Sequence, residues 1–219
     1  MISSSLKKLF LVCLATLFIA SPALAKDYIV DLVIFESLTP EAASDYSSNL
    51  YYPLSRNAVE LGGSTANNAG FRVVDANTSM KSIAGKLQSS GRYRVISHLS
   101  WQQPGLAEST ARPVKLSFGQ PVNLYLPVNA VAENHLIRAL TPGTEISAAQ
   151  AEAVQSAQLS GTVTLSLGKY LHLKTNLVLI KPDGSGSTRM QIDRRMRSRE
   201  FHYLDNPRFG LIVLTVPVD

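Results

Sequence analysis

A run of five arginines within eleven residues, from Arg189 to Arg199, is the most concentrated chemical feature of the sequence. Guanidinium groups bind carboxylates through pairs of parallel hydrogen bonds, and a neighbouring aromatic ring can stack on a sugar. If residues 188–203 form one long strand, alternate side chains share a face, and one face then carries Arg195, Arg197, Arg199, Phe201 and Tyr203. The pattern predicts a platform for a ligand with carboxylates and sugar rings.

The same run also has a structural interpretation. Charged side chains on an edge strand prevent that strand from pairing with strands of other molecules. Both interpretations are open from the sequence alone. The binding interpretation adds histidine and aromatic side chains on this and other predicted strands, and these further candidate ligand-binding residues are His202, Tyr170, His172 and Trp101.

Recognisable catalytic and metal-binding patterns are missing from the sequence. It contains no nucleophile elbow, zinc-protease helix, phosphate loop or dinucleotide fingerprint. Single histidines on strands are more often structural than metal ligands, and no close spacing links His98, His135, His172 and His202. The one cysteine, Cys13, lies in an N-terminal segment that we expect to be removed, which excludes disulfides and thiol catalysis. We therefore predict a protein that is not an enzyme and that needs no metal and no cofactor.

The N-terminus has the parts of a secretory signal peptide. Lys7 and Lys8 precede an apolar run over residues 9–20, and an A-x-A cleavage site ends at Ala25. We predict a signal peptide over residues 1–25 and a single periplasmic domain over residues 26–219. No later apolar run is long enough to span a bilayer, so we expect a protein that is not membrane-embedded. The net charge of +5 includes the two signal-peptide lysines, and the remaining bias is too weak to indicate a nucleic-acid partner.

Periodic patterns predict the elements that would position these side chains. Residues 28–35 and 210–218 are apolar on both faces, which is typical of interior strands. The first of these contains Asp31, a carboxylate that would need a buried partner, and an arginine from the C-terminal third is the candidate. Helices are predicted over residues 79–91 and 147–158, and most of the last third reads as strands. We therefore expect an α+β fold: a single domain with a largely antiparallel sheet and two or three packed helices.

Three segments resemble, in the same order, the motifs of the CsiV family. Residues 92–105 read RYRVISHLSWQQPG and are similar to its G-x-Y-x-V-h-x-H-x-x-W-x-Q-P passage. Residues 159–173 read LSGTVTLSLGKYLHL and resemble its GThxLxLGRYLH segment. Residues 194–210 read RRMRSREFHYLDNPRFG and resemble its signature RRMRSxELHYLDHPxFG. The chain departs from that signature at Asn206 and Arg208, where a histidine and an apolar residue are expected.

The resemblance implies a non-enzymatic periplasmic protein that binds peptidoglycan and supports cell-wall synthesis. It also implies two protein partners: an outer-membrane lipoprotein activator and the penicillin-binding-protein synthase that this lipoprotein activates. A protein–protein scaffold of the wall machinery without direct glycan binding is the alternative, with the arginine strand pairing to an acidic or edge-strand partner. A wall hydrolase would need acid/base carboxylates or a metal, and the sequence offers neither in recognisable form.

Overall fold

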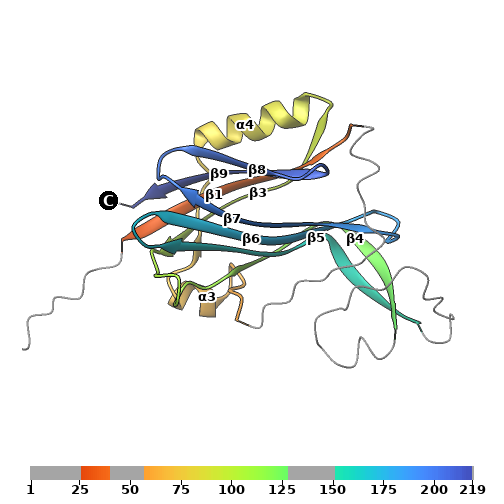
Figure 1. Cartoon of the computed structure of the whole chain (residues 1–219), viewed down its shortest axis with the longest axis horizontal. Coiled ribbons are helices and arrows are strands. Elements are labelled where there is room, and N and C mark those ends of the chain that lie inside the picture. Colours follow the sequence, from red (N-terminus) through yellow and green to blue (C-terminus); the bar gives the residue numbers. More distant parts are fainter. Residues whose placement is uncertain (1–25, 40–56, 128–150, 219) are drawn as a thin grey trace, which may run out of the picture.

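Strands dominate the architecture, which is that of a β-sandwich (Figure 1). The computed structural model describes residues 26–39, 57–127 and 151–218, so the predicted signal peptide lies outside the described residues. The described strands form two antiparallel sheets, and the described helices are α3 (Ser64–Asn68) and α4 (Thr78–Ser89). The predicted α+β fold with two or three helices packed on one sheet is therefore wrong. Neither described helix has the length and apolar character needed to span a bilayer.

The first sheet has the order β2-β3-β1-β9-β8 and contains both strands that the sequence predicts as interior. β1 pairs with β3 on one side and with β9 on the other, and β9 also pairs with β8. Because β1 and β9 have a neighbour on each side and are covered on both faces, the prediction from their two-sided apolarity is confirmed. The strand bounds are β1 (Asp27–Ser37), β2 (Arg72–Val73), β3 (Tyr93–Pro104), β8 (Phe201–Asp205) and β9 (Phe209–Pro217).

The second sheet has the order β4-β5-β6-β7 and corrects one predicted helix. Residues 151–158, predicted as the greater part of a helix over 147–158, instead begin β5; residues 147–150 lie outside the described part of the chain. The alanine-rich segment favours a helix locally, but its backbone pairs with β4 from Ala151 onward, and this pairing overrides the local propensity. The bounds are β4 (Val114–Pro127), β5 (Ala151–Leu167), β6 (Leu171–Ile180) and β7 (Ser187–Met196).

A single cluster of buried side chains fills the space between the two sheets. Val30, Leu32 and Ile34 of β1 belong to it, together with Leu165 of β5 and other residues of both sheets. Trp101 of β3 is also fully buried in this cluster, and its indole N–H donates to Gln103 Oε1 at 2.8 Å. Trp101 is thus a core residue, and its ring has no exposed face for the ligand contact predicted from the sequence.

Helix α4 covers the outer face of the first sheet and confirms the helix predicted over residues 79–91, with its end two residues earlier. Its buried Met80 packs in a second apolar cluster with Val33 and Phe35 of β1. Asn77 caps the helix by accepting a hydrogen bond from the backbone of Ser79.

The buried carboxylate of Asp31 lies beneath the start of α4. Its Oδ1 is 2.7 Å from His98 Nε2, and its Oδ2 accepts a 2.6 Å hydrogen bond from the backbone N–H of Asn77. The expected arginine partner from the C-terminal third is therefore wrong. His98 on the neighbouring strand and the backbone N–H of Asn77, the N-cap residue of α4, satisfy this carboxylate instead.

The predicted long strand over residues 188–203 is divided between the two sheets. β7 is an edge of the second sheet and β8 is an edge of the first, and residues 197–200 connect them. Arg199 has a φ of 66°, the left-handed conformation that a turn uses and a continuous strand does not. The predicted common face of Arg195, Arg199 and Tyr203 consequently does not exist.

Candidate functional site

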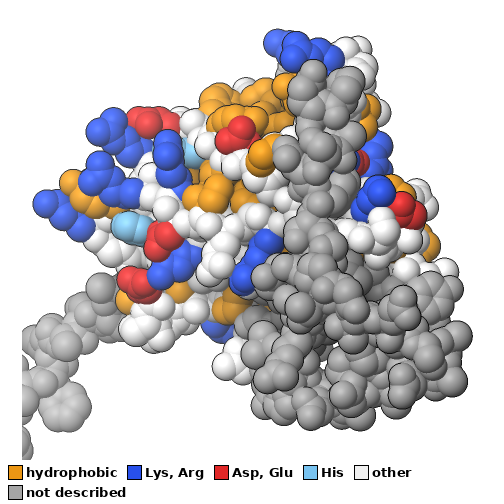
Figure 2. Space-filling view, turned by 45° about the vertical axis from the view of Figure 1, so that its right-hand side comes forward, with side chains coloured by type: hydrophobic (Ala, Val, Ile, Leu, Met, Phe, Trp, Pro, Cys, Tyr) orange, Lys and Arg blue, Asp and Glu red, His pale blue; other side chains and the backbone are white. Residues whose placement is uncertain are grey.

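Two cationic regions lie at opposite ends of the second sheet. We call the first the basic end and define it by Lys169, Tyr170, His172, Arg195 and Arg197. It forms because the turn after β5 and the last residues of β7 come together, with Leu171 paired to Met196. Figure 2 shows Lys and Arg side chains gathered at the left-hand end of the molecule, with acidic and histidine side chains among them.

Arg195 and Tyr170 make the central contact of the basic end. The Arg195 guanidinium carbon lies 4.4 Å from the centroid of the Tyr170 ring, and Lys169 Nζ lies 5.7 Å from the same centroid. His172 is adjacent, since it faces Arg195 across the β6–β7 pairing. Arg195 has no hydrogen-bond or ion-pair partner among the described residues, so stacking holds the guanidinium while its N–H groups remain open to a ligand.

Nearby acidic groups are engaged by other side chains. Asp193 lies 3.4 Å from His172 Nδ1 and 3.5 Å from Lys174 Nζ. Glu108 accepts a 2.5 Å hydrogen bond from Lys174, and this bond together with the charge of Glu108 raises the pKa of Lys174. Both carboxylates contact Lys174, and neither forms an ion pair with Arg195.

The other predicted residues of the arginine run have different surroundings. Arg197 is exposed and lies 3.6 Å from Glu200. His202 Nε2 lies 3.1 Å from both the backbone N and the backbone O of Arg197, so its ring holds the turn. The backbone N–H of Arg199 donates to Thr215 O at 2.7 Å, which ties the same turn to β9.

Tyr203 is separated from the basic end. Its ring stacks on Phe35 at 6.2 Å between centroids with an interplanar angle of 10°, on the face of the first sheet that α4 covers. Desolvation of the ring and the nearby carboxylate of Asp205 raise the pKa of Tyr203 to about 12, so its hydroxyl is neutral at physiological pH. Of the predicted residues, the structure brings together Tyr170, His172 and Arg195 with Arg197 beside them.

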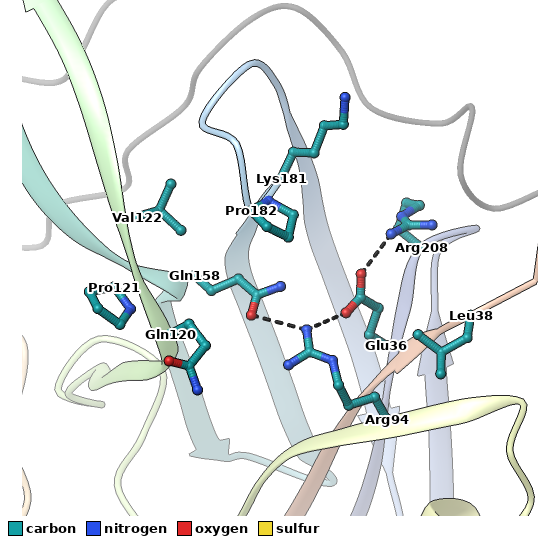
Figure 3. Close-up of a pocket in the computed structure, with 10 residues that line it drawn as sticks. All are labelled: Glu36, Leu38, Arg94, Gln120, Pro121, Val122, Gln158, Lys181, Pro182 and Arg208. Atoms are coloured by element: carbon teal, nitrogen blue, oxygen red, sulfur yellow. Dashed lines mark hydrogen bonds and ion pairs between the residues drawn. The ribbon is translucent and has the colours of Figure 1, made fainter.

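The second cationic region is a cavity of about 420 Å³ between the two sheets, which sequence reasoning missed (Figure 3). We call it the inter-sheet cavity. It lies at the other end of the second sheet, beside the turn that joins β6 to β7. The first sheet and its turns supply the polar residues Glu36, Arg94 and Arg208, and the second sheet and its turns supply Gln120, Gln158 and Lys181.

Glu36 is the centre of the polar network in this cavity. Only 5% of its side chain is exposed, and its two oxygens accept from different guanidiniums, Arg94 Nη2 at 2.5 Å and Arg208 Nη2 at 2.6 Å. Arg94 Nη2 also donates to Gln158 Oε1 at 3.0 Å. Figure 3 shows Arg94 between Glu36 and Gln158, so this one guanidinium links the two sheets across the cavity.

Local turn chemistry positions two of these side chains. Asn206 Oδ1 accepts from the backbone N–H groups of Arg208 and Phe209, which fixes the turn that presents the Arg208 guanidinium to Glu36. Gly119 interrupts β4 with a φ of 87°, and a Cβ at this position would lie 2.9 Å from Gln158 Cβ. The absence of a side chain at Gly119 therefore makes room for Gln158.

The rim of the cavity is formed by a tight turn after β6. Lys181 Nζ lies 3.0 Å from Asp183 Oδ2, and Asp183 Oδ1 accepts from both the backbone and the hydroxyl of Ser185. The hydrogen bonds from Ser185, with a further one from Lys181, lower the pKa of Asp183 to about 2. Asp183 is thus ionised at physiological pH and balances the charge of Lys181.

No local pattern in the sequence indicates this cavity. Glu36 is 58 residues from Arg94 and 172 residues from Arg208, and Gln158 is 64 residues from Arg94. A signal in the sequence was Arg208, a charged residue at a position where an apolar residue is expected. Within the described part of the chain, no three histidine, cysteine or acidic residues form a group that could hold a metal ion.

Comparison with known proteins identifies the family. No curated protein and no solved structure shows significant similarity to the chain. A family model described as "Peptidoglycan-binding protein, CsiV" matches residues 6–218, which is nearly the whole chain. The resemblance of the three segments is therefore confirmed, and the chain belongs to the CsiV family of peptidoglycan-binding proteins.

Proposed function

We propose that this chain acts in the periplasm as a non-enzymatic peptidoglycan-binding protein and that the basic end contacts the wall polymer. Membership in a peptidoglycan-binding family supports the ligand class and suggests a periplasmic or cell-wall location. The observation that carries the choice of surface is the open guanidinium of Arg195 stacked on Tyr170. The signal peptide over residues 1–25 is part of the same proposal.

The chemistry of the basic end matches that of the polymer. Peptidoglycan has peptide carboxylates, which a guanidinium binds through parallel hydrogen bonds, and amino-sugar rings, which stack on aromatic rings. Stacking on Tyr170 fixes the plane of the Arg195 guanidinium before a ligand arrives, so little additional side-chain entropy is lost on binding. Arg197 and Lys169 add positive charge that attracts the polymer at low salt.

We also propose that the protein supports wall synthesis together with a lipoprotein activator and a penicillin-binding-protein synthase, as the family resemblance implies. The position of β7 and β8 favours a second candidate function, a protein–protein scaffold without direct glycan binding. Each is an edge strand of its sheet, and an edge strand can pair with a strand of a partner. The arginines would then protect or orient that edge.

Sedimentation with insoluble sacculi tests the binding surface. We expect Lys169→Gln, Arg195→Gln and Arg197→Gln in one chain to weaken co-sedimentation about tenfold or more if the contacts are shielded from water, because each shielded charged hydrogen bond contributes about 1.5–3 kcal/mol. Added salt should weaken binding of the unmodified chain. A matched control removes three exposed charges elsewhere, at Arg72, Lys81 and Lys86, and should bind normally.

The other outcomes separate the alternatives. A folded triple variant that still co-sediments would contradict the proposed surface, and increased self-association of that variant would favour edge protection. An unmodified chain that fails to co-sediment would favour the scaffold. Release of soluble muropeptides from the sacculi would contradict the proposal of a non-enzymatic protein.

A further inference from the structure

The inter-sheet cavity contains a buried hydrogen-bond donor that no protein group satisfies. Gln158 is 1% exposed, and its Nε2 has no hydrogen-bond partner among the described residues. Arg94 donates to the Oε1 of the same amide, which fixes the orientation of the amide and leaves the NH₂ group as the open donor. Figure 3 shows this NH₂ group directed into the space between Pro182 and Glu36. An unsatisfied buried donor in a folded protein calls for an acceptor, which a water molecule, an ion or a ligand can supply.

Arg94 supplies a second set of donors to the same space. Both of its contacts with described residues use Nη2, so its remaining N–H groups have no acceptor among those residues. In Figure 3 its other terminal nitrogen points toward Gln120, on the second-sheet side of the cavity. A planar guanidinium beside an amide NH₂ group presents convergent donors, which is the arrangement that a carboxylate accepts.

The charges and walls of the cavity restrict the ligand further. Glu36 is the only acidic residue among its described lining residues, and the guanidinium groups of Arg94 and Arg208 both contact it, so the lining favours a second anion. The apolar lining residues lie on both sides of these groups, with Pro121, Val122 and Pro182 on the second-sheet side and Leu38 beside Glu36 (Figure 3). The ligand should therefore combine a carboxylate with a small apolar group next to it.

We propose that the inter-sheet cavity binds the free carboxyl terminus of a short peptide that ends in a small apolar residue. Gln158 Nε2 and Arg94 donate to the carboxylate, and the adjacent small side chain contacts the apolar lining residues. Assigning this peptide to the stem peptides of peptidoglycan rests on the proposed function. The cavity itself is independent of the basic end, because the ten residues of β6 separate them by roughly 30 Å.

Titration of the purified chain with alanyl-alanine and with its C-terminal amide tests the proposal without sacculi. Calorimetry should detect binding of the free acid only, and NMR should show a shift of the side-chain NH₂ signals of Gln158. Gln158→Met changes the shape little but removes both the NH₂ donor and the Oε1 atom that accepts from Arg94, and we expect it to weaken dipeptide binding about tenfold or more. Gln191→Met, a matched change on an exposed residue of β7, should leave binding unchanged.

Several results would overturn the assignment. Equal binding of the acid and the amide, no measurable binding of either, or unchanged binding by Gln158→Met would exclude a carboxylate held by this amide. Acetate that binds as tightly as the dipeptide would exclude a peptide end as the ligand. If Gln158→Met fails to fold, the shift of the Gln158 signals in the unmodified chain remains the deciding measurement. The sacculus experiment changes only the basic end, and the dipeptide titration tests only the inter-sheet cavity. Each proposal can therefore fail while the other holds.

Discussion

The basic end and the inter-sheet cavity both depend on arginines, but the two regions hold them in opposite ways. At the basic end, Arg195 and Arg197 are exposed to water, and Arg197 lies 3.6 Å from a carboxylate that is itself exposed. In the cavity, Arg208 is 9% exposed and shares the buried carboxylate of Glu36 with Arg94. Water screens the first set of charges and is largely excluded from Glu36 and Arg208, whereas 36% of the Arg94 side chain is exposed.

The exposed and the buried arginines should therefore affect different properties, ligand binding in the first case and folding stability in the second. An exposed guanidinium contributes little to folding, and its removal should affect mainly what the protein binds. A buried guanidinium and its carboxylate are held by each other, and the loss of one leaves the other desolvated and unpaired. The same residue type should therefore give opposite results in a folding assay at the two ends of the second sheet.

The largest expected effect comes from Glu36. Glu36→Ala leaves two guanidiniums facing the cavity without the carboxylate between them, and we expect it to lower the free energy of unfolding by about 3–5 kcal/mol. Glu200→Ala is the matched change at the basic end, where Glu200 lies 3.6 Å from Arg197, and it should cost less than about 0.5 kcal/mol. Urea denaturation of both variants measures the difference, and equal losses would remove the distinction between the two ends.

The contrast also explains what the sequence could predict. The arginine run is contiguous, so composition alone reveals it, and the two-sided apolarity of β1 and β9 predicts their interior positions. The division of that run between two sheets was not predictable, because Arg199 occupies the left-handed turn position where glycine or asparagine would have been the signal. Tyr203 and Trp101 were misplaced for related reasons. The sheet that a strand joins, and the face on which its side chains lie, depend on pairing between distant strands.

The cavity, in contrast, could not be predicted from the sequence. The residues of its central network, Glu36, Arg94, Gln158 and Arg208, come from β1, β3, β5 and the turn before β9, and only long-range pairing brings them together. Residues 151–158 illustrate the same limit, since their alanine content favours a helix while pairing with β4 makes them a strand. Local propensity predicted α4, where capping and apolar spacing agree, and failed where tertiary contacts dominate.

The next effect concerns the packing that holds Gln158 in place. Gly119→Ala adds a methyl group at a φ of 87° and 2.9 Å from Gln158 Cβ. Gly62→Ala is a matched control, since its φ is 89° but nothing lies within 4 Å of the added atom. Both should lose about 1–2 kcal/mol to backbone strain, and Gly119→Ala should lose about 1–3 kcal/mol more from overpacking. Equal losses in thermal or urea denaturation would mean that Gln158 moves freely.

A smaller effect tests whether Tyr170 orients Arg195 in solution. We expect a double-mutant cycle with Arg195→Gln and Tyr170→Ala to give a coupling of about 0.5–1 kcal/mol in the free energy of unfolding, because an exposed cation–π contact contributes this much. The same cycle with Tyr203→Ala in place of Tyr170→Ala should give no coupling, since Tyr203 stacks on Phe35 instead. A coupling near zero for Tyr170 would leave Arg195 without the fixed orientation that the binding proposal uses.

The smallest expected effect is a local pH dependence at the rim of the cavity, and it tests how the cavity obtains its charge. Hydrogen bonds from Ser185 hold the pKa of Asp183 at about 2, below its ordinary value of 3.8. A lowered pKa means that the turn gains its stabilisation above the ordinary value and loses it as the pH falls through about 2. The backbone N–H signal of Ser185 should therefore be constant from pH 7 to pH 4 and shift with a midpoint near pH 2. Asp183→Asn should abolish this titration. A midpoint near 3.8 would mean that the turn opens in solution. Lys181 would then no longer pair with Asp183, and its charge would be added to the cavity that Arg94 and Gln158 line.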